Sequence, residues 1–113
     1  MHIKNLLIVL TLVAAAGCSR DPVITITNKS SLTLSNAVVS GSGFSESVGS
    51  IAARGEHSLT VRPHGESGVR IAFDAGTNHV DSGEQGYFEA GGGYRVAILV
   101  STNLNVSVSS DLR

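Results

Sequence analysis

The chain contains little of several residue types that define common protein classes. Its 113 residues include one Cys, two Pro and no Trp, and only 15% of them are charged. A single Cys excludes an internal disulfide framework and any zinc site built from several thiolates. Eight Lys and Arg residues are balanced by nine Asp and Glu residues, whereas a nucleic-acid binder carries a basic face. We therefore expect one domain that forms no internal disulfide and binds no nucleic acid.

An apolar run stands near the start of the chain. Residues 1–5 carry one Lys, and residues 6–16 are apolar except for Thr11. As a helix, this run would rise about 16 Å, well short of the bilayer's hydrocarbon core, which is ~30 Å thick. A charged start, a short apolar middle and small residues at the exit are typical of a secretory signal peptide. The pattern predicts a helical signal peptide over residues 1–17.

The residues that end this run, Ala15-Ala16-Gly17-Cys18, resemble the lipobox of bacterial lipoproteins, although that family more often has Leu where Ala15 stands. The resemblance implies that the Cys18 thiol receives a diacylglyceryl group, that the signal is cut before Cys18, and that the new amine is acylated, with palmitate as a typical chain. Acyl chains contribute about 0.8 kcal/mol per buried CH₂ and would hold the protein on a lipid bilayer. Ordinary cleavage after Ala16 is the alternative, and it would export Cys18 as a lone thiol.

Residues 18–22 are polar apart from Cys18 and Pro22, and we interpret them as a short tether. Enteric lipoproteins with Asp directly after the lipidated Cys stay in the inner membrane. Ser19 stands there in this chain, so the resemblance implies an outer-membrane location facing the periplasm.

Beyond Pro22, apolar and polar residues alternate in short runs, which is the pattern of half-buried strands. Gly, Asn and Ser clusters separate the runs at intervals typical of a β-sandwich. The pattern predicts an all-β fold, a single Ig-like antiparallel β-sandwich of seven to eight strands over residues 23–110. Gly91-Gly92-Gly93 is the best hairpin candidate because glycine accepts positive φ. The candidate strands are residues 23–27, 32–40, 44–48, 58–62, 69–74, 77–80, 85–89, 94–101 and 104–109.

A second resemblance concerns turn residues. Asn28-x-Ser30 and the stretch 49–56, which ends in Arg54-Gly55-Glu56, loosely resemble bacterial Ig-like modules related to cell adhesion. The shared residues lie in turns, so the resemblance implies the fold and not the function.

Metal and catalytic patterns are weak in this chain. His57, His64 and His79 lack the spacing of zinc ligands, and the oxygen-rich stretch 74–84 lacks the residue order of an EF-hand loop. The stretch 65–69 suggests a nucleophile elbow but ends in Val69 instead of Gly. We therefore expect no catalytic residues, no metal and no cofactor, and interpret the stretch 74–84 as a polar hairpin.

Two aromatic residues remain as candidates for partner binding. Tyr87 and Phe88 are adjacent, so a strand directs one inward and the other outward, and we expect Tyr87 to be the outward one. Phe44 is the second candidate, because we expect segments 41–44 and 81–87 to meet at one loop end. The sequence thus predicts a non-enzymatic envelope lipoprotein that binds another envelope or periplasmic protein. The alternative function is a periplasmic inhibitor or immunity-type lipoprotein that blocks a toxin or hydrolase.

Overall fold

The computed structural model describes residues 20–112, so the predicted signal peptide and Cys18 lie outside the described residues. Every regular element of the described part is a strand. The nine strands are β1 (Val23–Asn28), β2 (Leu34–Gly41), β3 (Phe44–Ile51), β4 (Glu56–Thr60), β5 (Glu66–Ala75), β6 (Asn78–Asp81), β7 (Gln85–Glu89), β8 (Tyr94–Val100) and β9 (Val106–Leu112).

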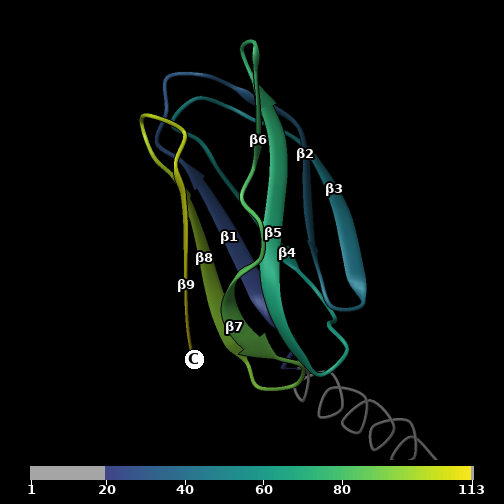
Figure 1. The fold of residues 1–113 in the computed structure, drawn as a ribbon. Helices are drawn as coiled ribbons and strands as arrows, with labels where there is room; N and C mark the ends of the chain where they lie inside the picture. The colour runs from purple at the N-terminus through teal and green to yellow at the C-terminus, as the bar shows by residue number, and fades with distance from the viewer. Residues whose placement is uncertain (1–19, 113) are drawn as a thin grey trace, which may run out of the picture.

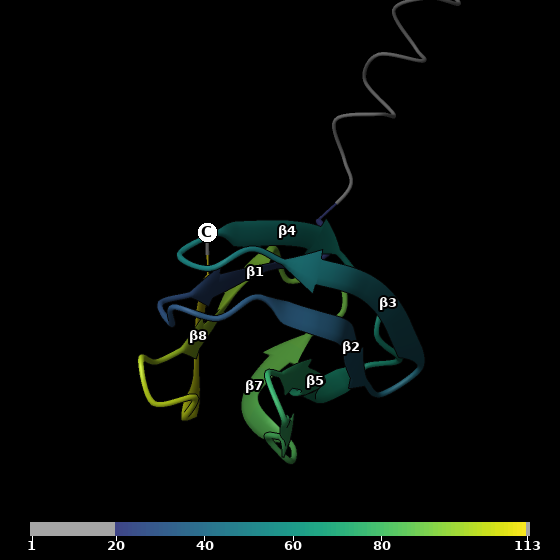
Figure 2. The ribbon, with the colours of Figure 1, turned by 90° about the horizontal axis from the view of Figure 1, so that it is seen from above.

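The strands form two sheets that pack face to face (Figure 1). The β1 sheet has the order β4-β1-β8-β9, and the β5 sheet has the order β3-β2-β5-β6, with β7 also paired to β5. Figure 2 looks along the strands and shows β1 and β4 on one side of the core and β5 and β7 on the other. The predicted β-sandwich is confirmed, with nine strands instead of seven or eight. One pair, β1 with β8, is parallel.

Alternation along the strands builds the core. Ile24 and Ile26 of β1 face Ile71 and Phe73 of β5, and all four side chains are fully buried. Ile98 of β8 joins them with 1% of its surface exposed. Burying one such side chain contributes about 1.5–3 kcal/mol. Aliphatic residues therefore make up most of the core, as the low aromatic content requires.

The sandwich has two ends, which differ in the connections they carry. The Arg20 end holds residues 20–22, the connections 42–43, 61–65 and 90–93, and the last residue of β9. The opposite end, which we call the far end, holds the turns 29–33, 52–55, 76–77 and 101–105. Strand β5 runs from the Arg20 end to the far end (Figure 1).

The glycine-rich turn 90–93 does not close a hairpin, so that prediction is wrong. Strand β7 pairs with β5, whereas β8 pairs with β1 and β9, so the turn crosses from one sheet to the other. Gly91 and Gly93 have φ of 73° and 70°, a conformation that glycine adopts without strain. Glycine thus permits the sharp reversal, but it does not determine which strand the chain pairs with next.

The ordered domain begins earlier than residue 23. The carbonyl of Arg20 accepts a hydrogen bond from the Gly93 N–H at 2.9 Å, and the carbonyl of Pro22 accepts one from Val61 at 3.1 Å. Pro22 is buried, and Asp21 forms an ion pair with Arg62 at 3.1 Å. The last three residues of the predicted 18–22 tether therefore belong to the fold. At the other terminus, β9 continues to Leu112, beyond the predicted boundary at residue 110.

Candidate functional site

The edge strand beside β5 is interrupted between β6 and β7. Strand β6 pairs with the second half of β5, and β7 pairs with its first half. The segment 81–87 therefore runs along the middle of β5 and into its first half (Figure 1). Segment 81–87 is therefore an edge of the sheet and not the expected loop end, but it does meet segment 41–44, because Gly41, Ser42 and Glu84 line one hollow of about 390 Å³.

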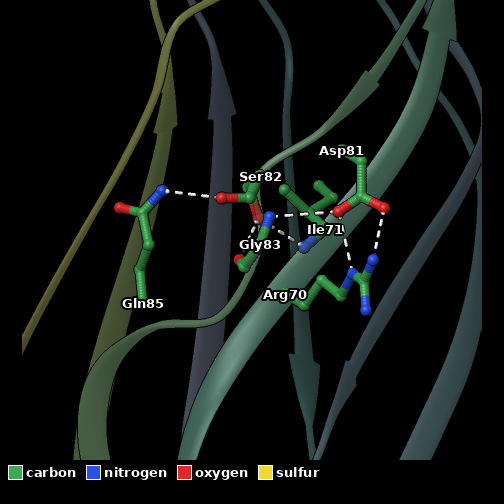
Figure 3. A network of polar contacts seen from close by, with 6 residues as sticks. All are labelled: Arg70, Ile71, Asp81, Ser82, Gly83 and Gln85. Atoms are coloured by element: carbon green, nitrogen blue, oxygen red, sulfur yellow. Dashed lines mark hydrogen bonds and ion pairs between the residues drawn. The ribbon is translucent and has the colours of Figure 1, made fainter.

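Hydrogen bonds of the backbone and the side chain of Ser82 replace the missing strand pairing at this junction (Figure 3). The N–H of Ser82 donates to the carbonyl of Ile71 at 2.9 Å, and the Ser82 Oγ accepts from the N–H of Ile71, also at 2.9 Å. The Ser82 hydroxyl donates in turn to the carbonyl of Gly83 at 2.7 Å. Ser82 thus provides hydrogen-bond partners for both the backbone N–H and the carbonyl of Ile71 where the pairing of the strands is interrupted.

A bidentate ion pair fixes the outer side of the same junction. Arg70 donates to both carboxylate oxygens of Asp81, at 2.8 and 2.6 Å, and Gly83 donates its N–H to Asp81 at 3.0 Å. The hydrogen bonds from Arg70 and Gly83 lower the pKa of Asp81 to about 2, and the same pairing raises the pKa of Arg70. The pair is exposed, so its main effect is to set the course of the chain between β6 and β7.

Strand β7 also contacts the other sheet. Gln85 donates from Nε2 to the carbonyls of Ser82 at 3.3 Å and Val106 at 3.4 Å. The hydroxyl of Ser110 in β9 donates to the carbonyl of Tyr87. Strand β7 is thus held by β5 on one side and by β9 on the other, which gives Tyr87 a fixed backbone.

Tyr87 points outward with 46% of its surface exposed, and Phe88 is fully buried, as the alternation predicted. The ring of Tyr87 meets Tyr94 edge-on, with the ring centroids 6.4 Å apart. Hydrogen bonding to the carboxylate of Glu89, partial desolvation and the charge of Glu66 raise the pKa of Tyr87 to about 12. The phenol is therefore neutral at physiological pH and oriented by its neighbours.

Carboxylates surround the ring. Glu66 and Glu89 lie directly opposite each other in the β5–β7 pair, and Glu84 accepts a hydrogen bond from the N–H of Gly68 at 3.2 Å. We call Tyr87 and these three glutamates the Tyr87 surface. A hollow of about 250 Å³ lies within it, lined by Glu66, Ser67, Gly68, Glu84, Gly86 and Tyr87.

Phe44, the other candidate for partner binding, is half-buried. Its ring lies 6.3 Å from that of Phe88, centroid to centroid, and covers Gly41 so closely that a Cβ there would lie 2.5 Å from the nearest ring atom. Phe44 thus packs on the edge of the core. Its role in partner binding stays a prediction, and Tyr87 offers the larger free ring.

The three candidate histidines lie on separate elements. His57 is in β4, His64 lies in the connection from β4 to β5, and His79 is in β6. His79 contacts Asp74 through Nδ1 at 2.8 Å, and this contact lowers the pKa of Asp74. The stretch 74–84 contains the β5–β6 hairpin with its turn at 76–77. Among residues 20–112, no group of three or more His, Cys, Asp and Glu side chains is placed to hold a metal ion.

No model of a known protein family matches the chain, and no curated protein sequence matches it. One similar solved structure is described as the NMR structure of the protein from Eubacterium rectale. It is 16% identical, the match covers 82% of this chain and 88% of that chain, and the TM-score is 0.49. Within the described residues, we find no helix long and apolar enough to cross a membrane.

Proposed function

We propose that the protein is a bacterial envelope lipoprotein, anchored through Cys18, whose non-catalytic β-sandwich binds another envelope or periplasmic protein. The observation that carries the proposal is the placement of Cys18. It is the only Cys of the chain, it follows Gly17 at the end of the apolar run, and it stands two residues before Arg20, the first residue that the structure describes. Removal of residues 1–17 would therefore leave every described contact of the sandwich intact.

The binding surface we propose is the Tyr87 surface. A tyrosine offers a large ring and a polar tip at little cost in side-chain entropy, and such residues are enriched among those that dominate interfaces. The backbone of Tyr87 is already fixed by β5 and β9, so little order is lost when a partner binds. Glu66, Glu84 and Glu89 give the surface a negative charge, which suits a partner that presents Lys or Arg.

Metabolic labelling tests the lipid anchor. A palmitate analogue should label the wild-type protein and leave Cys18→Ser unlabelled, and the labelled protein should fractionate with the outer membrane. A wild-type protein that stays unlabelled and is released into the periplasm would contradict the proposal.

Affinity capture from detergent-solubilised envelope tests the binding surface. The affinity of the captured partner for Tyr87→Ala should fall by about 1–3 kcal/mol, roughly 5- to 150-fold. Leu99→Ala is the matched control, because Leu99 is 38% exposed on the other sheet, and its affinity should not change. A captured toxin or hydrolase whose activity is blocked would favour the inhibitor function. Loss of function on replacing His57, His64 and His79 together, restored by added metal, would overturn the proposal.

A further inference from the structure

The distance between the proposed lipid anchor and the folded domain is very short. Arg20 is the second residue after Cys18, and two residues of extended chain span at most about 7 Å. Arg20 itself is fixed, because its carbonyl accepts the hydrogen bond from Gly93. Its guanidinium also lies so near that a Cβ on Gly93 would approach Nη2 within 3.0 Å. An anchor at Cys18 therefore constrains one particular end of the sandwich.

We propose that the Arg20 end of the sandwich lies on the lipid bilayer, with the turn 90–93 and the side chain of Leu112 against the lipid. This inference rests on the proposed lipidation of Cys18. With so short a tether, the domain cannot move far from the membrane, and the end that carries Arg20 is the end nearest to it.

The side chains at this end support the same orientation. Leu112 is 64% exposed, more than Leu32, Val38, Tyr87 and Leu99, the other large hydrophobic residues exposed in the described part of the chain. In the β8–β9 register Leu112 lies opposite Tyr94, the residue that follows Gly93. An exposed leucine gains free energy when it leaves water for the apolar part of a membrane interface. The exposed side chain of Arg20 lies at the same end and can reach lipid phosphates, whereas the exposed side chain of Arg62 is paired with Asp21.

The orientation specifies where a partner must be. The ten residues of β5 span about 30 Å, so the far end stands about that distance from the bilayer. Tyr87 belongs to β7, which pairs with the first half of β5, next to the Arg20 end. A protein that contacts the Tyr87 surface must therefore reach close to the membrane surface.

Tryptophan fluorescence tests the orientation, because the chain has no Trp of its own. Ala90→Trp places a reporter in the exposed turn at the Arg20 end, and Thr77→Trp places a matched reporter in the exposed hairpin turn at the far end. The mature chain, which begins at Cys18, is coupled through its single thiol to a maleimide lipid in phosphatidylcholine vesicles. The emission of Ala90→Trp should be shifted to the blue by the contact with lipid and quenched by lipids brominated near the glycerol backbone. The emission of Thr77→Trp should be the same in brominated and unbrominated vesicles.

Two further variants test the contact with lipid. Leu112→Ser in the Ala90→Trp background should reduce the quenching, because the side chain placed against the lipid becomes polar. Leu32→Ser is its control, since Leu32 is 40% exposed at the far end, and it should leave the quenching unchanged. Both side chains are exposed, so neither variant removes a core residue.

The coupling through maleimide separates this inference from the proposed function. Quenching at residue 90 alone supports the orientation even when metabolic labelling shows no lipid on Cys18. In that case only the proposed lipidation is wrong. Equal quenching of the two reporters, or quenching at residue 77 alone, overturns the orientation whether or not Cys18 is labelled in cells.

Discussion

Two features of the fold determine the exposure and the surroundings of the Tyr87 side chain. Its exposure follows from the alternation along β7, which buries its neighbour Phe88. Its surroundings also depend on residues of other strands, the edge-on ring of Tyr94 in β8 and the charge of Glu66 in β5. The first feature is readable in the sequence, because strand side chains alternate. The second is not, because it depends on which strands become neighbours.

The phenol of Tyr87 should ionise only at an unusually high pH. The chain contains two Tyr, and a spectrophotometric titration above pH 9 follows the ionisation of a tyrosine phenol. We expect an apparent pKa of about 12 for Tyr87, and Tyr87→Phe should remove that step. Glu89→Gln should move it back toward the ordinary pKa of about 10, because Glu89 makes the main contribution to the shift. A single step near pH 10 in the wild type would contradict the described contact.

Asn28 is a buried polar residue that stabilises the far end. Its side chain donates to the carbonyls of Leu32 at 2.8 Å and Ala52 at 3.0 Å. It accepts from the N–H and the hydroxyl of Ser30 at 3.0 and 2.7 Å. The turn between β1 and β2 is thereby connected to the turn between β3 and β4. The Asn28-x-Ser30 motif of the sequence thus has a structural role.

Asn28→Ala should destabilise the fold by about 2–4 kcal/mol, because buried carbonyls and the Ser30 N–H lose their partner. Asn105→Ala is the control. Asn105 is exposed, and a surface substitution of this kind changes stability by about 0.5 kcal/mol or less. Urea unfolding followed by circular dichroism measures both free energies. Equal values for the two variants would show that the Asn28 contacts do not stabilise the protein.

Among the elements, the junction between β6 and β7 makes the stability of the protein depend on pH. Asp81 has a pKa of about 2 in the folded chain and near 3.8 in the unfolded chain. A carboxyl group whose pKa is lowered by folding stabilises the protein above its unfolded pKa, and that contribution is lost as the pH falls toward the folded value. Hydrogen bonds with His79 and Asn36 also lower the pKa of Asp74.

The melting temperature should therefore fall between about pH 4 and pH 2. Asp81→Asn should lower the melting temperature at pH 7 and make the acid decline shallower, while the contribution of Asp74 remains. Thermal unfolding measured at several pH values by circular dichroism checks both effects. An Asp81→Asn variant with the same acid decline as the wild type would show that this ion pair has no part in it.

The strands themselves are largely predictable from the sequence, and their connections are not. Runs such as 69–74 and 94–101 alternate cleanly, so their positions and buried faces agree with β5 and β8. The glycine turn 90–93 was assigned to a hairpin because glycine indicates only that the chain reverses. Nothing local indicates that β7 joins one sheet and β8 the other.

At the scale of the whole molecule, long-range pairing determines the arrangement that the sequence pattern leaves open. Strand β1 pairs in parallel with β8, whose residues follow about 70 positions later in the chain. Such a pairing is set by the total burial of both sheets and not by a local motif. The same reason applies to Phe44, whose half-buried position against Phe88 depends on two strands that are not adjacent in sequence.

The whole sandwich should unfold when a charged residue replaces a residue of the core that the two sheets share. Ile98 of β8 is 1% exposed, and its neighbour Leu99 on the opposite face is 38% exposed. Ile98→Asp places a carboxylate without a partner between the sheets, at a cost of several kcal/mol. The whole stability of such a domain is about 5–15 kcal/mol, so this variant should be unfolded or close to it.

Leu99→Asp supplies the matched control for Ile98→Asp, because it adds the same charge to the same strand on the solvent side. We expect the mature wild-type chain and Leu99→Asp to show the far-UV circular dichroism of β-sheet and one cooperative unfolding transition. Ile98→Asp should lose both signals, since every strand of the two sheets depends on the same core. A stable, cooperative Ile98→Asp protein beside an unfolded Leu99→Asp protein would mean that β8 presents its other face to the core.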